Sequence, residues 1–115
     1  MHELALSDSI VRTVLDACGT GPEHVRKIGL EVGALSAVNV SSLEFCMQVV
    51  LEQSGMKQVA VEIREVRARV ECACGRAYEP ADMFTPCPDC DGFDRRIVAG
   101  NDLTVEYVEV DDEQD

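Results

Sequence analysis

The sequence contains few aromatic and few basic residues. It has no tryptophan, two tyrosines and three phenylalanines, and it contains 10 Lys and Arg compared with 22 Asp and Glu. The formal net charge of −12 repels phosphate backbones, which argues against nucleic-acid binding. No stretch approaches the roughly 18 apolar residues of a membrane-spanning helix, so we expect no membrane association. An acidic chain suits protein partners or cationic metal cargo instead.

Several functional signatures are also missing. The first ten residues contain no basic segment, and Asp8 interrupts their apolar positions, so we expect no secretory signal and a cytoplasmic location. A GxxxxGK[ST] phosphate-binding loop is absent, and two histidines leave little for general acid–base catalysis. We therefore do not expect an enzyme.

Four of the six cysteines form two close pairs. Cys72 and Cys74 make a CxC pair, Cys87 and Cys90 make a CxxC pair, and twelve residues separate the pairs. Two such pairs on tight turns can converge on one tetrahedral zinc ion. A disulfide and a redox-active CxxC are the alternatives. The missing secretory signal argues against the former, and the Pro- and Gly-rich surroundings of the CxxC pair argue against the latter.

The remaining cysteines and one of the two histidines are predicted to have no metal role. Cys18 and Cys46 lie within helical apolar patterns, so we interpret them as small buried hydrophobic residues that do not pair with each other. His24 follows a Gly-Pro turn and is interpreted as a surface residue.

Apolar periodicity predicts an α+β fold with two helices on a three-stranded sheet. The predicted elements are a helix over residues 3–18, a strand over 25–32, a helix from 41 to 55, and strands over 59–63 and 103–107. Ser41 and Glu44 match a capping box at the start of the second helix. Because two strands alone make a marginal sheet, the last strand is expected to return to the first two.

The segment between the second and third strands, residues 67–100, is predicted to be an inserted four-cysteine, zinc-ribbon-like domain. It contains few large apolar side chains, so the metal is expected to supply much of its folding free energy. Residues 1–66 and 101–115 are predicted to form the other domain in two segments. Its last five residues, from Asp111, read as a solvated acidic tail.

The start of the chain offers a different set of metal ligands. Histidine is too large a second residue for removal of Met1, so the free α-amine of Met1 is expected to remain. This amine, the amide nitrogen of His2 and the His2 imidazole can form fused chelate rings, which Glu3 can complete through its backbone nitrogen or its carboxylate. Such planar, nitrogen-rich ligation suits Ni(II) or Cu(II). Taken alone, an N-terminal histidine is more often a solvated residue, and that alternative stays open.

Three segments together resemble the HypA/HybF family of hydrogenase nickel-incorporation proteins. They are MHELALSDSIV at the start, KIGLEVGALSAV at residues 27–38, and the four-cysteine insert that ends in CPDC. The resemblance covers essentially residues 1–110. It implies a nickel metallochaperone that serves the [NiFe]-hydrogenase large subunit together with a HypB-type GTPase. It also implies a nickel site at His2 and the N-terminal backbone, with Glu3 following, and a structural zinc domain.

The first cysteine pair departs from the family pattern. The family usually has CxxC there, and strict column matching places Glu71 at the first ligand position. We assign Cys72 with Cys74, Cys87 and Cys90, because a fourth thiolate completes the set, and keep Glu71 as the alternative oxygen ligand. A zinc-ribbon adaptor with structural zinc only is the alternative function. The sequence leaves both a monomer and a homodimer open.

Overall fold

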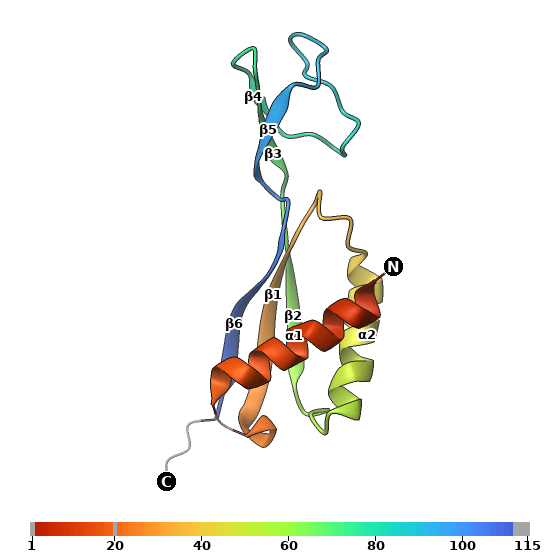
Figure 1. Cartoon of the computed structure of the whole chain (residues 1–115), viewed down its shortest axis with the longest axis vertical. Helices are drawn as coiled ribbons and strands as arrows, with labels where there is room; N and C mark the ends of the chain where they lie inside the picture. Colours follow the sequence, from red (N-terminus) through yellow and green to blue (C-terminus); the bar gives the residue numbers. More distant parts are fainter. Residues whose placement is uncertain (1, 20, 112–115) are drawn as a thin grey trace.

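The chain forms two stacked parts along one long axis, each built around a small sheet (Figure 1). The computed structural model of the chain describes residues 2–19 and 21–111, and the molecule measures 60 × 28 × 18 Å. The elements are α1 (Glu3–Cys18), the 3₁₀ helix η1 (Pro22–His24), β1 (Val25–Gly33), α2 (Val40–Gln53), β2 (Ala60–Val66), β3 (Arg69–Cys72), β4 (Ala77–Tyr78), β5 (Arg95–Ala99) and β6 (Leu103–Val110). We call α1, α2, β1, β2 and β6 the lower part, and residues 67–100 the upper part.

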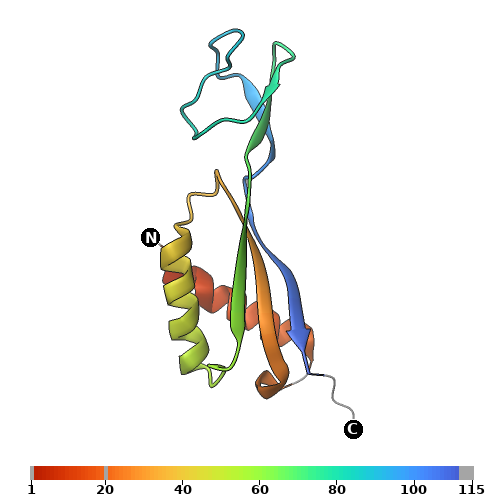
Figure 2. The same ribbon diagram turned by 180° about the vertical axis from the view of Figure 1, so that it is seen from behind.

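The sheet of the lower part has the strand order β2-β1-β6. β1 pairs in parallel with β2 and antiparallel with β6. A parallel pair needs a crossover connection, which α2 supplies between β1 and β2. Both helices lie on the same face of the sheet, and Figure 2 shows the other face with α1 behind the strands. The predicted α+β class and the return of the last strand to this sheet are confirmed.

The apolar core of the lower part lies between the sheet and the two helices. Ile28, Leu30 and Val32 alternate along β1 and are at most 2% exposed, as expected for the core-facing side of a strand. The helices contribute further buried residues: Ile10, Val11 and Val14 from α1, and Leu43, Met47, Val50 and Leu51 from α2. Helical spacing places each set on one stripe, which is why the sequence period predicted these helices correctly.

The start of α2 differs from the prediction. The capping residue is Asn39, whose side chain accepts a hydrogen bond from the Ser42 N–H at 2.9 Å. The capping box assigned to Ser41 and Glu44 is therefore wrong, because α2 already begins at Val40 and Ser41 lies exposed inside it. Asn is as good a cap as Ser, so the helix begins two residues earlier without loss.

The upper part contains a second three-stranded sheet, of order β4-β3-β5, which the sequence analysis did not predict. β3 pairs antiparallel with both neighbours. The small core of this part consists of Leu35, Ala68, Val70, Cys72, Tyr78 and Cys87. Leu35 lies in the loop after β1, so a residue from outside residues 67–100 completes the upper core.

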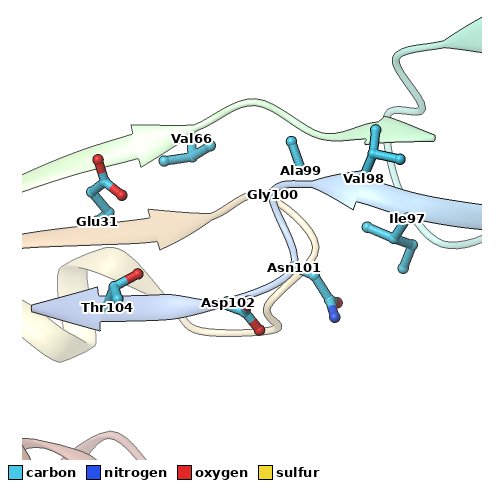
Figure 3. Close-up of a pocket in the computed structure, with 9 residues that line it drawn as sticks. All are labelled: Glu31, Val66, Ile97, Val98, Ala99, Gly100, Asn101, Asp102 and Thr104. Atoms are coloured by element: carbon cyan, nitrogen blue, oxygen red, sulfur yellow. The ribbon is translucent and has the colours of Figure 1, made fainter.

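Two glycines let the backbones cross closely where the parts meet. A Cβ on Gly33 would lie 2.3 Å from the Gly100 backbone, and one on Gly100 would lie 2.7 Å from Ala68 Cα. Backbone hydrogen bonds of 2.8 Å join Gly33 N to Asp102 O and Leu35 N to Gly100 O. A pocket of about 280 Å³ opens beside this crossing (Figure 3). The close approach explains why neither position tolerates a side chain.

Candidate metal centre

The four paired cysteines converge in the upper part. The sulfur atoms of Cys72, Cys74, Cys87 and Cys90 all lie within 4.8 Å of one another. Cys72 Sγ is 3.6 Å from Cys90 Sγ, and Cys74 Sγ is 3.7 Å from Cys87 Sγ. A zinc–sulfur bond is about 2.3 Å, which puts the sulfurs of a tetrahedral site about 3.8 Å apart. The thiols therefore fit one tetrahedral metal ion.

Tight backbone turns hold each pair in place. In the first pair, Gly75 N donates to Cys72 O and Cys72 N donates to Arg76 O, both at 2.8 Å, so the CxC pair lies on the turn between β3 and β4. In the second, Asp91 N donates to Cys87 O at 2.8 Å. Each turn leaves its two thiols pointing to the same side, as a chelating pair requires.

The electrostatics of the cluster favour a cation. Burial raises the pKa of the Cys87 thiol, but the N–H groups of Cys90 and Asp89 donate to its sulfur, and the pKa falls to about 7. The Gly92 N–H lowers the pKa of Cys90, yet the Cys72 thiol and burial outweigh it and raise the pKa to about 12. Thiols this close do not all ionise together unless a bound cation balances their charge.

Glu71 does not join the cluster. It neighbours Cys72 on β3, but adjacent side chains point to opposite faces of a strand. Its carboxylate accepts a hydrogen bond from the Arg96 guanidinium on β5 and is exposed to solvent. The geometry thus brings Cys72, and not Glu71, to the other three thiols.

The other interpretations of the CxxC pair fit poorly. All six cysteines fall within the described residues, and all are free thiols; the 3.6 Å between Cys72 Sγ and Cys90 Sγ far exceeds a disulfide bond of about 2.0 Å. Cys87 and Cys90 lie in a loop that leads to β5. A thioredoxin-like centre would instead place the pair at the start of a helix.

Two of the predicted nickel ligands, His2 and Glu3, lie at the start of α1. Met1 lies outside the described residues. His2 is exposed and is the residue immediately before α1, where its carbonyl accepts the Leu6 N–H at 2.9 Å. The Glu3 carboxylate accepts the Asn39 N–H at 3.0 Å, and this bond lowers the pKa of Glu3. Glu3 therefore connects the N-terminal ends of the two helices.

Cys18, Cys46 and His24 do not belong to the four-cysteine group. Cys18 is half-buried and packs against the lower core, whereas Cys46 is half-buried on α2, so neither is as buried as predicted. His24, predicted at the surface, is half-buried in η1, with Nδ1 3.8 Å from an Asp111 oxygen and Nε2 3.5 Å from a Glu23 oxygen. The rest of the predicted acidic tail, residues 112–115, lies outside the described residues.

Sequence reasoning missed one residue that organises the upper part. Arg95 donates from Nη1 to Tyr78 Oη at 2.7 Å and from Nη2 to Met83 O at 2.6 Å, and Nη1 also donates to Thr85 O. It fixes the loop that precedes the second cysteine pair. A clue was the arginine pair at the start of the alternating stretch RRIVA, since arginine can satisfy several loop carbonyls at once.

Comparison with known proteins identifies the family. The sequence profile of the family described as "Hydrogenase/urease nickel incorporation, metallochaperone, hypA" matches residues 1–110. The chain belongs to the HypA family. It is 31% identical over 109 residues to the hydrogenase maturation factor HypA of Francisella philomiragia, covering 94% of this chain and 97% of that one. The HypA of Rhodopseudomonas palustris is 33% identical over 113 residues, covering 96% and 100%.

The fold also matches a solved HypA structure. The solution structure of the nickel metallochaperone HypA from Helicobacter pylori aligns with a TM-score of 0.69 at 20% identity, covering 98% of this chain and 100% of that one. At this identity the match establishes the shared fold. Among the described residues, no helix is long and apolar enough to cross a membrane.

Proposed function

We propose that this HypA-family protein is a nickel metallochaperone that binds Ni(II) at its N-terminus and delivers it during maturation of [NiFe]-hydrogenase. The observation that carries the proposal is the contrast between its two ligand sets. Four thiols in the upper part converge within 4.8 Å of one another and can fill all four positions around one ion, whereas His2 is exposed at the start of α1. A closed tetrahedral site suits a resident ion, and an accessible chain end suits an ion that must leave.

The resident ion is proposed to be zinc, held by Cys72, Cys74, Cys87 and Cys90. Zinc bound by four thiolates has no open coordination position, so its role is structural. The upper part, residues 67–100, is then a zinc domain inserted into a nickel domain made of residues 1–66 and 101–115. The core of the upper part is small and includes two of the ligands themselves, which supports a fold that depends on its metal.

The cargo is proposed to be Ni(II), bound by the α-amine of Met1 and by the amide and imidazole nitrogens of His2. For the fourth donor we propose the backbone nitrogen of Glu3. The Glu3 carboxylate already accepts the Asn39 N–H at 3.0 Å, and using it as a ligand would break that bond. Planar nitrogen ligation favours Ni(II) over zinc.

Delivery requires partners and no catalysis by this chain. We propose a HypB-type GTPase, which supplies nucleotide energy, and the apo-form of the hydrogenase large subunit as the recipient. The cysteines are free thiols, and reduced thiols persist in the cytoplasm, so we place this protein there. The protein has no chemical step of its own to perform, and we propose that it is not an enzyme.

The test is a nickel titration of tag-free, zinc-loaded protein by calorimetry, with intact mass to verify Met1. We expect one Ni(II) per chain, with an affinity that rises with pH because binding releases amide and imidazolium protons. His2→Ala, or one extra residue before Met1, should abolish this binding and leave zinc content unchanged. Glu3→Gln should retain nickel, since the backbone nitrogen is intact.

Two outcomes would contradict the proposal. Normal nickel binding by the N-terminally extended protein would disprove the chelate-ring geometry. A wild-type protein that binds zinc and no nickel would favour the alternative function, a zinc-ribbon adaptor.

A further inference from the structure

The end of the upper part exposes large apolar side chains. We call residues 79–94 the tip; they form the teal and light-blue loops at the upper right of Figure 1. Phe84 is 83% exposed, Phe93 58% and Met83 49%. Scattered exposed apolar residues are ordinary, but three within twelve residues of one loop region of an aromatic-poor chain are not. They are candidates for contact with another molecule.

Hydrogen bonds within the upper part hold the tip in a defined conformation. The Arg95 guanidinium bonds the carbonyls of Met83 and Thr85 and lies 5.5 Å from the centre of the Phe93 ring. Asp82 Oδ1 accepts the Phe84 N–H at 2.9 Å and the Thr85 hydroxyl at 3.1 Å. The loop is therefore fixed while its apolar side chains face solvent. A preorganised apolar surface loses little conformational entropy when it binds.

The charge of the tip restricts what can bind it. Residues 79–94 contain five acidic residues and no lysine or arginine. The acidic residues are Glu79, Asp82, Asp89, Asp91 and Asp94. Arginines outside this range pair with two of them: Arg76 with Asp89 at 3.1 Å and Arg67 with Glu79 at 2.9 Å, which leaves three acidic residues without an arginine partner in these pairs. A zinc ion with four thiolates, as proposed above, adds a formal −2. A suitable partner therefore combines an apolar pocket with a rim of Lys and Arg.

The position of the tip relative to the start of α1 favours the nickel recipient as its partner. In both views the tip and the start of α1 lie on the same side of the long axis (Figures 1 and 2). A protein that covers the tip would extend along the side where His2 lies. Resting on the proposed function, we infer that Phe84, Phe93 and Met83 dock into a basic-rimmed apolar pocket of the recipient large subunit. The dock holds the recipient against the molecule while nickel leaves His2.

Other occupants fit the charge poorly. A second copy of this chain has the same net charge of −12 and an equally acidic tip, so tip-to-tip contact is repulsive. A bilayer surface with anionic lipids repels the tip for the same reason. These considerations leave a basic protein surface.

The experiment measures binding of full-length, zinc-loaded protein to purified apo large subunit, and separately to the GTPase, at two salt concentrations. Phe84→Ser is the main variant, because Phe84 takes part in the hydrogen bonds of the loop through its backbone N–H and not through its side chain. Phe45→Ser is the matched control, since Phe45 is 70% exposed on α2. Asp91→Asn with Asp94→Asn removes charge; Asn tolerates the positive φ of 61° at Asp91.

We expect Phe84→Ser to weaken large-subunit binding by about tenfold, mainly through faster dissociation, with zinc content, nickel binding and GTPase binding unchanged. The charge variant should slow association and reduce its salt dependence. Phe45→Ser should bind within about twofold of wild type.

Three results would overturn the inference: unchanged large-subunit binding by both variants, an equal loss with Phe45→Ser, or a Phe84 effect on the GTPase alone. If Phe84→Ser loses zinc, the inference is judged by the charge variant alone, and unchanged association of that variant with the large subunit overturns it. Failure of the wild type to bind nickel, with Phe84-dependent docking intact, would instead contradict the proposed function and leave the dock standing.

Discussion

The lower and upper parts are stabilised by different means. The lower core joins two helices and three strands through aliphatic side chains and methionines. The upper core has six buried residues, of which two are cysteines and one is Leu35 from outside the part. Burial of apolar surface is enough for the first and too small for the second. The comparison teaches that the metal cluster replaces a core that the upper part cannot build.

The largest expected effect is selective unfolding of the upper part without its metal. Chelation, or Cys87→Ser, should abolish amide-exchange protection in β3 and β5 and leave β1 protected, because metal binding contributes on the order of 10 kcal/mol to folding of such sites. Hydrogen exchange followed by NMR or mass spectrometry is the measurement. Cys46→Ser, outside the cluster, is the control. Simultaneous loss of protection in β1 would show that the parts are not independent.

Truncation of a core side chain in the lower part should instead destabilise the lower part and leave the metal cluster of the upper part unchanged. Leu43 is fully buried on α2, so Leu43→Ala should reduce the free energy of unfolding by about 2–5 kcal/mol, as measured by urea denaturation. Leu4→Ala removes the same atoms from a residue that is 55% exposed and should cost less than about 0.5 kcal/mol. Zinc content should stay unchanged in both. Release of zinc by Leu43→Ala would show that the metal cluster of the upper part depends on the core of the lower part.

A substitution at the crossing tests how the parts are joined. Gly33→Ala places a Cβ against the Gly100 backbone, which cannot rotate away, so we expect a cost of about 1–3 kcal/mol by urea denaturation. Gly29→Ala is the matched case, because its Cβ would meet the Tyr107 ring, a side chain that can swing off the open face of the sheet. Equal costs for the two would mean that the crossing relaxes easily.

The smallest expected effect concerns the end of the lower sheet. Asp111 accepts two hydrogen bonds of 2.6 Å from Arg26, and this guanidinium lowers the pKa of Asp111 below its usual 3.8. A lowered folded-state pKa contributes stability above the unfolded pKa, which is lost as pH falls through the folded value. NMR titration of the carboxyl should show the low pKa, and Arg26→Gln should return it toward 3.8. No change on substitution would rule out the pairing.

The sequence predicted the lower part well because its elements follow regular periods. The helical stripe of α1 and the alternation in β1 each repeat often enough to be recognised, and the return of β6 follows from the need for a third strand. The cap of α2 was misplaced because Asn39 and Ser41 are equally good caps, and only the surrounding fold selects one.

The upper part was less predictable because its order depends on contacts across long loops. β4 has two residues and β3 has four, which is too short for a periodic signal. The spacing of the cysteines did predict that four thiols meet. The family pattern raised Glu71 as an alternative ligand, but side chains alternate along β3, so Glu71 points away from the thiols. The roles of Leu35 and Arg95 arise from tertiary packing and leave little trace in local sequence.

The central claim is that nickel moves and zinc stays. The most direct measurement mixes protein carrying both metals with the apo large subunit, the GTPase and GTP, separates the proteins, and quantifies nickel and zinc in each by mass spectrometry. The account predicts nickel in the large subunit and one zinc retained per chain of this protein, with no nickel transfer from His2→Ala. Zinc arriving with the nickel, or transfer that persists in His2→Ala, would contradict it.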